Sequence, residues 1–219
     1  MVDSRPRVDR GEHYFAERPT GPDERRTLRV GLAGRDVQVT TASGIFSGDR
    51  VDLGTAVLLR EVPDPPASGE LLDLGCGWGP LALTMGMLSP EATVWAVDVN
   101  ERALNLVAVN AAALGLRGVR ACPPHAVPPQ VRFDVIWSNP PIRVGKTVLH
   151  AMLLDWLARL APGGSAYLVV QRNLGSDSLH QWLTGTLEAH LEVERFASAK
   201  GFRVLRIRRD DGSALPDPA

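Results

Sequence analysis

The spacing of hydrophobic positions changes along the chain, from a period of two residues to one of three to four. Residues 27–39 alternate between apolar and polar side chains on both sides of an Ala33-Gly34 turn. Strict alternation predicts half-buried strands, so we expect an antiparallel hairpin there. Asp52 can cap a short helix over residues 53–61.

From residue 70 onward, short apolar runs alternate with helical stripes. Such runs predict buried strands, and stripes with a 3.6-residue period predict helices packed on one face. Strands are expected at 71–74, 94–97, 119–121, 133–137 and 166–170, helices from Pro80, after Asn100, over 147–160 and over 177–189, and a closing hairpin at 192–199 and 202–208. This order predicts an α/β fold with an open, mostly parallel, doubly wound sheet of seven strands. The tight turn between the last two strands makes one of them antiparallel, and we expect it at the edge.

The stretch PDPPASG at residues 63–69 has the composition of a linker. We therefore assign residues 1–66 to an N-terminal arm, hairpin and short helix, and residues 67–209 to the main domain. Residues 210–219 are expected to be a disordered tail.

A glycine-rich turn follows the predicted strand 71–74 and precedes a predicted helix. It reads Asp73-x-Gly75-x-Gly77-x-Gly79, with Pro80 next. Glycines let the backbone turn tightly and approach a ligand, and the free N–H groups of the helix face whatever the loop holds. Asp98 ends the next strand, nineteen residues beyond Gly79, a spacing that suits a carboxylate bound to the hydroxyls of a ribose.

Two cofactor classes fit this pattern: a nicotinamide or flavin dinucleotide, or another adenosine cofactor such as S-adenosylmethionine. The dinucleotide fingerprint G-x-G-x-x-G requires a third glycine where this chain has Pro80. A carboxylate at Asp73 would also be a poor neighbour for pyrophosphate and a good one for a cationic amino acid. The sequence therefore favours S-adenosylmethionine.

A second motif, Ser138-Asn139-Pro140-Pro141, leaves the strand predicted at 133–137. Two prolines make this backbone stiff. An NH2 group can donate to the Asn139 side-chain oxygen and to the Pro140 carbonyl, which orients the nitrogen lone pair toward an electrophilic methyl group. Asn139 and Pro140 are therefore the candidate catalytic residues.

These motifs together resemble the bacterial small-subunit ribosomal RNA guanine-N2 methyltransferases and their single-domain relatives. The resemblance rests on a set of short stretches spread over residues 13–208: DLGCGWG, VDVN, SNPPIR followed by GK, GIFS with DLGT, and KGFRVLR. It implies a Rossmann-like seven-stranded methyltransferase sheet. It also implies an S-adenosylmethionine-dependent enzyme that methylates the N2 amine of a guanine in ribosomal RNA or the small ribosomal subunit.

The resemblance also assigns site residues. The cofactor contacts it implies are Asp73, Gly75, Cys76, Gly77, Gly79, Asp98, Val99 and Asn139. The substrate contacts are Phe46, Pro141, Ile142, Arg143 and Lys146. Arg50 and Arg172 are further candidates for phosphate contacts, and Trp78 and Trp137 for holding a flipped base.

The chain departs from the family pattern at three points. Family members usually have an acidic residue where this chain has Ala42. No carboxylate lies between Arg120 and Arg132, so adenine would be read by backbone groups. The larger family members carry a second, degenerate copy of the domain, and this chain has one. RNA selection would then rest on the hairpin, on a second subunit in a homodimer, or on a different substrate.

Composition narrows the class of protein further. A net charge of −1 gives no global sign of nucleic acid binding, so an RNA partner requires a local basic patch. Two cysteines are too few for a disulfide framework or a zinc cluster, and we expect no metal. There is neither a signal peptide nor an apolar run of about 18 residues, so we expect a cytoplasmic protein and no membrane partner.

Other functions remain open. Protein glutamine and adenine-N6 methyltransferases share the Asn-Pro-Pro motif but typically place an aromatic residue next, where this chain has Ile142. A non-catalytic RNA-binding or ribosome-assembly protein that retains the fold is the third alternative. The intact loop and Asn139 argue against that alternative.

Overall fold

The computed structural model describes residues 24–45, 47 and 49–212. The predicted N-terminal arm, Phe46 and most of the predicted tail lie outside the described residues. The predicted division into three segments stays a prediction.

The predicted hairpin is present as β1 (Arg25–Leu32) and β2 (Arg35–Ala42), which form a separate two-stranded antiparallel sheet. Ala33 and Gly34 both have positive φ, at 48° and 71°. That is the requirement of the two-residue turn that matches the twist of a hairpin. The hairpin buries Val30 and Val39 against the helices of the main sheet.

The main sheet has seven strands in the order β5-β4-β3-β6-β7-β9-β8. Its strands are β3 (Ser68–Leu74), β4 (Glu91–Val97), β5 (Val119–Cys122), β6 (Phe133–Ser138), β7 (Leu160–Gln171), β8 (Leu191–Ala199) and β9 (Phe202–Arg209). β9 pairs antiparallel with both β7 and β8, and the pairs from β5 to β7 are parallel. The predicted α/β fold with one antiparallel strand is confirmed.

The position of the reversed strand was predicted wrongly. β9 lies between β7 and β8, so the edge strand is β8. Val204 and Leu205 are consecutive in β9 and both fully buried, whereas Glu192 and Arg195 of β8 are exposed. A strand buried on both faces needs neighbours on both sides, and its more polar partner therefore takes the edge.

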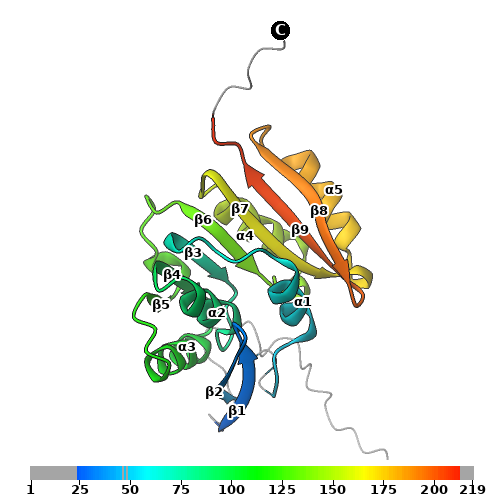
Figure 1. Ribbon diagram of the computed structural model, residues 1–219. Coiled ribbons are helices and arrows are strands. Elements are labelled where there is room, and N and C mark those ends of the chain that lie inside the picture. Colours follow the sequence, from blue (N-terminus) through cyan, green and yellow to red (C-terminus); the bar gives the residue numbers. More distant parts are fainter. Residues whose placement is uncertain (1–23, 46, 48, 213–219) are drawn as a thin grey trace, which may run out of the picture.

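Five α-helices cover the sheet. They are α1 (Leu53–Glu61), α2 (Pro80–Leu88), α3 (Glu101–Ala113), α4 (Lys146–Leu157) and α5 (Ser176–Thr186). The described residues also include the single-turn 3-10 helices η2 (Pro124–Ala126), η3 (Ile142–Val144) and η4 (Arg172–Leu174). One apolar cluster joins α1, α2 and α3 to one face of the sheet, and another joins α4 and α5 to the opposite face (Figure 1).

The predicted N-caps are confirmed. The Asp52 carboxylate accepts from the backbone N–H groups of Gly54 and Thr55 at the start of α1. The Asn100 side chain accepts from Arg102 and Ala103 at the start of α3. Both helices therefore begin where short polar side chains satisfy their first free donors.

The helix predicted over 147–160 ends at Leu157, and β7 begins six residues before the predicted strand. Leu160 pairs with Phe133 of β6 and does not belong to the helix. Gly164 lets the chain bend after this pair, because a Cβ there would lie 2.7 Å from the Phe133 carbonyl oxygen. Leu160 therefore belongs to the sheet, although the helical spacing of apolar residues had placed it in the helix.

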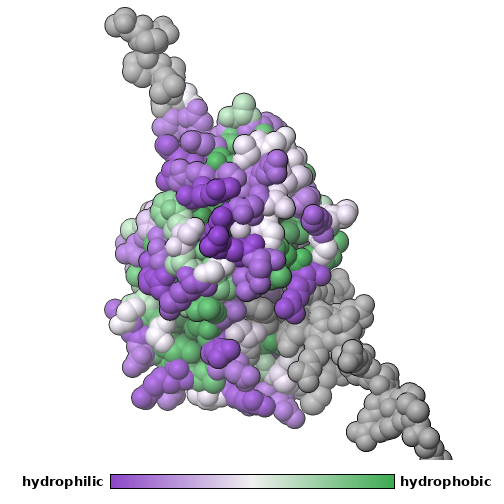
Figure 2. Space-filling model, turned by 90° about the vertical axis from the view of Figure 1, so that its right-hand side faces the viewer, coloured by the Kyte–Doolittle hydropathy of each residue, from purple (hydrophilic) through white to green (hydrophobic). Residues whose placement is uncertain are grey.

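The surface is mixed in character. Seen from the right-hand side of Figure 1, hydrophilic side chains predominate and are interrupted by smaller hydrophobic areas (Figure 2). Within the described residues, no helix is long and apolar enough to cross a membrane. In the same part of the chain, no three acidic, histidine or cysteine side chains form a group that could hold a metal ion.

Candidate active site

A cleft of about 610 Å³ opens at the carboxyl ends of the central strands. Leu74 ends β3, Val97 ends β4 and Asn139 follows β6, and all three line it. A smaller recess adjoins the cleft and shares Asp52, Gly75 and Asn139 with it. The Ser138 hydroxyl donates to the Leu74 carbonyl, 64 residues earlier in the chain. The glycine loop and the Asn-Pro-Pro motif therefore meet at one site.

The loop between β3 and α2 is fixed to the end of β4. The N–H groups of Gly75 and Cys76 donate to the Val97 carbonyl at 2.8 and 3.1 Å. Gly75 and Gly77 have positive φ and line the cleft, and a Cβ at Gly77 would point into open space. These two glycines therefore leave room for a ligand.

Gly79 has another role. It lines neither the cleft nor the recess, and a Cβ there would lie 2.9 Å from a methyl group of Val107. Its φ of 95° starts α2 in a left-handed conformation. The third glycine of the loop thus serves the packing of α2 on α3, and its predicted contact with a cofactor stays without support from the geometry.

Asp73 lies fully buried beneath the loop. One carboxylate oxygen accepts from the Ala82 N–H at 2.8 Å, and the other has no partner among the described residues. Burial raises the pKa of Asp73 to about 8, the Ala82 hydrogen bond lowers it in part, and the Asp98 charge raises it. Asp73 lines the recess, and its free oxygen suits a cationic or hydrogen-donating ligand group.

Asp98 holds the loop from the other side. Its two oxygens accept from the N–H groups of Gly77 at 3.0 Å and Asn100 at 2.9 Å. Burial raises the pKa of its carboxyl, and these backbone hydrogen bonds oppose the rise. Each oxygen has a further lone pair, so the carboxylate can also receive ligand hydroxyls in the cleft.

These features fit S-adenosylmethionine. The unpaired oxygen of buried Asp73 suits its ammonium group, and Asp98 suits the ribose hydroxyls. Val99, 44% exposed, and Pro124 line the same end of the cleft and offer apolar walls to adenine. Cys76 is buried in the loop, and burial raises the pKa of its thiol well above the usual value, so it contributes a neutral wall of the recess.

The position of Asn139 is set by its neighbour in the chain. The buried Ser138 hydroxyl donates to the Leu74 carbonyl at 2.7 Å, which joins the end of β6 to the end of β3. Asn139 therefore leaves the sheet directly beside Gly75. The Pro140 carbonyl accepts from the Ile142 N–H at 2.8 Å around Pro141, whose φ of −74° and ψ of 76° define an inverse γ-turn. Pro140 keeps one lone pair for a substrate.

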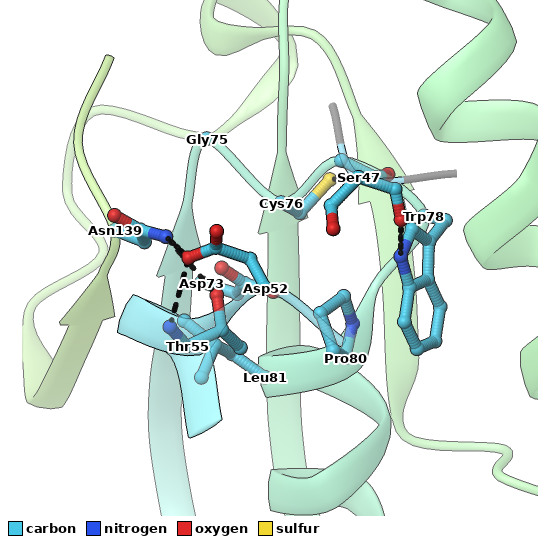
Figure 3. A pocket seen from close by; sticks show the side chains of 11 residues that line it. Ser47, Asp52, Thr55, Asp73, Gly75, Cys76, Trp78, Pro80, Leu81 and Asn139 are labelled. Carbon is cyan, nitrogen blue, oxygen red and sulfur yellow. Dashed lines mark hydrogen bonds between the residues drawn. The ribbon is translucent and has the colours of Figure 1, made fainter. Parts of the chain in front are cut away.

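Helix α1 supplies contacts to Asn139 that the sequence did not predict. The Asn139 side-chain nitrogen donates to the Asp52 carboxylate at 2.8 Å and to the Thr55 hydroxyl at 3.1 Å (Figure 3). The residues are 87 and 84 positions apart. Phe202 completes the group, because its ring lies next to Gly54 beside Asn139 and borders the cleft.

Beyond Asn139, the cleft continues between α4, η4 and β9 and is mainly apolar. Its walls there include Val148, Met152, Trp156, Gln171, Leu174 and Phe202. Val148 and Leu174 are 58% and 42% exposed, which is high for large apolar side chains at the rim of a cleft. The cleft therefore has a cofactor end and an apolar end, with Asn139 between them.

The other predicted substrate residues divide into two groups. Pro141, Ile142 and Arg143 line the cleft. Lys146, Arg50 and Arg172 are exposed but do not line it. Phe46 lies outside the described residues.

The proposed roles of two tryptophans in holding a base do not fit the structure. Trp78 and Trp137 are each 1% exposed. The Trp78 indole N–H donates to the Ser47 carbonyl at 3.2 Å, and Trp137 packs in the core between the sheet and α1. Phe202 is the aromatic side chain that the described part of the cleft offers near Asn139. Its only signal in the sequence was its place in the KGFRVLR stretch.

Comparison with known proteins points to one group of enzymes. The chain is 31% identical over 201 residues to the uncharacterized protein YbxB of Bacillus subtilis, spanning 90% of this chain and 98% of that protein. It is 36% identical over 173 residues to ribosomal RNA small subunit methyltransferase C of Photorhabdus laumondii, spanning 74% of this chain and 48% of that protein. The chain thus covers about half the length of that ribosomal RNA methyltransferase.

A solved structure has a similar fold. The 16S rRNA N2 G1207 methyltransferase of T. thermophilus, in complex with AdoMet and guanosine, matches with a TM-score of 0.73 and 26% identity over 86% of this chain and 51% of that one. The family model described as the methyltransferase small domain matches residues 36–206. This chain therefore belongs to the methyltransferase small domain family, as its glycine loop, buried Asp73 and Asn-Pro-Pro motif predict.

Proposed function

We propose that the chain is an S-adenosylmethionine-dependent N-methyltransferase and that its target is the exocyclic N2 amine of a guanine in ribosomal RNA. The observation that carries the proposal is the place of Asn139 in a continuous cleft, between a cofactor end built around Gly75, Gly77 and Asp98 and an apolar end that includes Met152, Trp156 and Phe202.

The cofactor supplies a methyl group already activated by its sulfonium. The Asn139 side-chain oxygen, with the free lone pair of the Pro140 carbonyl, would accept the two N–H groups of the target amine. The nitrogen lone pair would then face the activated methyl group, and the nitrogen would release one proton to solvent after transfer. Alignment of this kind can contribute about 7 to 11 kcal/mol.

The apolar end would receive the base and exclude water. Phe202 and Ile142 offer apolar surfaces to a planar ring, and Gln171 offers both a donor and an acceptor to its edge. A base within folded RNA would have to be flipped out of its stack to enter this end of the cleft.

Ribosomal RNA is favoured as the substrate by the relatives that carry that activity in their names, and guanine by the guanosine in the similar structure. The chain's own support is Arg143 at the cleft and the exposed Lys146 nearby in sequence, which are available for phosphates. A cytoplasmic location and a homodimer stay predictions.

The test is transfer of a labelled methyl group to small ribosomal subunits, and to free 16S rRNA, from cells that lack this protein. Digestion to nucleosides should place the label on N2-methylguanosine. Label on adenosine or on a protein glutamine would assign the chain to a rival class, and binding of RNA without transfer would favour an assembly protein.

The matched variant is Asn139→Ala. Because the reacting amine is the part of the RNA that Asn139 would contact, this variant should lower the single-turnover rate by about 100- to 1,000-fold. RNA affinity depends mainly on phosphate contacts and should change little. A wild-type rate in this variant would remove Asn139 from the mechanism.

A further inference from the structure

The Asn139 amide group is held in one orientation. Its nitrogen carries two hydrogens, and both have acceptors: the Asp52 carboxylate at 2.8 Å and the Thr55 hydroxyl at 3.1 Å. Figure 3 shows the nitrogen turned toward these two residues and the side-chain oxygen turned away from them. Both donors of the amide are therefore used, and its acceptor is left for another group.

Chemistry allows only this orientation. An ionised carboxylate has acceptors and no donor, so a flipped Asn139 would place its oxygen 2.8 Å from an Asp52 oxygen. Two acceptors at that distance repel each other. The amide nitrogen must therefore face Asp52, whatever occupies the cleft.

Asp52 is itself fixed. The same oxygen that accepts from Asn139 also caps α1, accepting from the N–H of Gly54 at 2.8 Å and that of Thr55 at 3.2 Å. A Cβ at Gly54 would lie 3.3 Å from the Asn139 nitrogen and 2.9 Å from the Asp52 oxygen. The first turn of α1 is thus packed against Asn139 so closely that only glycine fits between them.

We propose that Asp52 and Thr55 are positioning residues that hold the Asn139 amide with its oxygen toward the substrate, and so restrict the enzyme to targets that carry an N–H donor. The catalytic part of this inference rests on the proposed function. Its structural part, the fixed amide, does not depend on the substrate.

The restriction follows from hydrogen-bonding capacity. A site that presents only an acceptor can bind a primary or secondary amine in the reactive geometry. A ring nitrogen that has only a lone pair finds no donor from Asn139, because both amide hydrogens are committed to α1. Asp52 and Thr55 would thus select an exocyclic amine over a ring nitrogen.

Two variants of Asp52 separate helix capping from positioning. Asp52→Ser keeps an N-cap side chain but is too short to reach Asn139, so the unfolding midpoint should stay unchanged. The single-turnover rate should fall by about 10- to 100-fold, less than on removal of Asn139 itself. Asp52→Asn keeps a side-chain oxygen that can accept from Gly54, Thr55 and Asn139. Its rate should therefore be close to that of the wild type. Asp64→Ser, in the exposed segment after α1, is the matched control and should retain the wild-type rate.

Thr55 gives an independent test. Thr55→Val is nearly isosteric and removes one acceptor, and we expect about a 3- to 10-fold loss in rate, the effect of one neutral hydrogen bond. Thr55→Ser keeps the hydroxyl and should restore the rate. In an Asn139→Ala background, Asp52→Ser should cause no further loss, because Asp52 acts through Asn139.

A second readout needs no RNA. In protein labelled with 15N at asparagine, the side-chain NH2 signals of Asn139, assigned by their loss in Asn139→Ala, should exchange slowly with solvent in the wild type and at least tenfold faster in Asp52→Ser. If that exchange stays slow, or if Asp52→Ser retains the wild-type rate, the inference is wrong. If the wild type transfers no methyl group to RNA while the exchange result holds, the proposed function fails and the fixed amide stands.

Discussion

The Ser138 hydroxyl donates to the Leu74 carbonyl at 2.7 Å, and this one hydrogen bond joins the two strand ends from which the candidate site is built. Ser138→Ala should leave a buried carbonyl without its partner and lower the free energy of unfolding by about 1 to 3 kcal/mol. Because Asn139 follows directly, the transfer rate should fall as well. Denaturant unfolding and single-turnover transfer measure the two effects.

Ser89→Ala is the control for that variant. Ser89 is also buried, but its hydroxyl has no hydrogen-bond partner among the described residues. Its removal should be nearly neutral. Equal losses in the two variants would show that the Ser138 hydrogen bond does not stabilise the strand ends.

Substitution of Gly77 should impair cofactor binding, whereas substitution of Gly79 should impair stability. Gly77 has open space beside it and a φ of 54°, so Gly77→Ala should cost only about 1 to 2 kcal/mol of stability. Its added methyl group would enter the cleft and weaken binding of S-adenosylmethionine. Calorimetry should therefore show a binding defect in a folded protein.

Gly79→Ala combines a φ of 95° with a 2.9 Å contact to Val107, and should destabilise the fold by about 2 to 4 kcal/mol. Val107→Ala in the same protein should recover part of that loss, since it removes the contact but not the backbone strain. A Gly79→Ala protein that is stable but does not bind the cofactor would instead support the original prediction for this glycine.

Asp73 should make the ligand-free protein less stable as pH rises. The pKa of Asp73 in the folded state, about 8, lies above its ordinary value of 3.8, so between these values the folded state binds more protons than the unfolded state. Stability therefore falls with rising pH across this window, and the full penalty applies above pH 8. Thermal unfolding of wild type and Asp73→Asn from pH 5 to 9 should show a steeper decline in the wild type.

Cofactor binding should have the opposite dependence. An ammonium group next to Asp73 favours the ionised carboxylate, so affinity for S-adenosylmethionine should rise as pH approaches 8 and lose that part of its pH dependence in Asp73→Asn. Asp36→Asn, on the exposed hairpin, is the control. A parallel pH profile in wild type and Asp73→Asn would place the ammonium group elsewhere.

Asn110 should hold the hairpin to the main domain. Its buried side chain accepts from the Thr40 N–H at 2.6 Å and donates to the carbonyls of Thr40 at 2.9 Å and Trp78 at 3.3 Å. Asn110→Ala should cost about 2 to 4 kcal/mol, because several buried groups lose a partner. Asn105 of the same helix provides the control, because its hydrogen bond from Arg25 of the hairpin is exposed to solvent. A similar cost in Asn105→Ala would contradict the role of the buried Asn110.

Exposed basic side chains near the cleft should determine RNA affinity. Arg143→Ala with Lys146→Ala should weaken RNA binding and reduce the slope of log affinity against log salt by about 1 to 2, since up to two phosphate contacts are lost. Binding of S-adenosylmethionine should not change. An unaltered salt slope would move the RNA contacts to another surface, for which Arg29 and Arg35 of the hairpin are the next candidates.

The local features of this protein were readable from the sequence. Alternating apolar and polar positions predicted the hairpin, and short apolar runs predicted the strands of the main sheet. Short polar side chains before helical stripes gave the caps at Asp52 and Asn100. Each depends on residues within a few positions of one another, where propensity, capping and turn geometry act. The glycine loop, Asp98 and Asn139 could also be placed, because parallel strands bring their carboxyl ends to one edge.

Tertiary structure decided what depends on distant partners. Asp52 was predicted as a helix cap, but its contact with Asn139, 87 residues away, follows only from the packing of α1 against β7 and β9, which brings its first turn to the end of β6. Phe202 lines the cleft because β9 pairs with β7. Trp78 is buried in the core because the hairpin packs over it, so it cannot contact a substrate. No local period encodes such contacts, since they arise from the order of strands in the sheet and from which apolar faces meet.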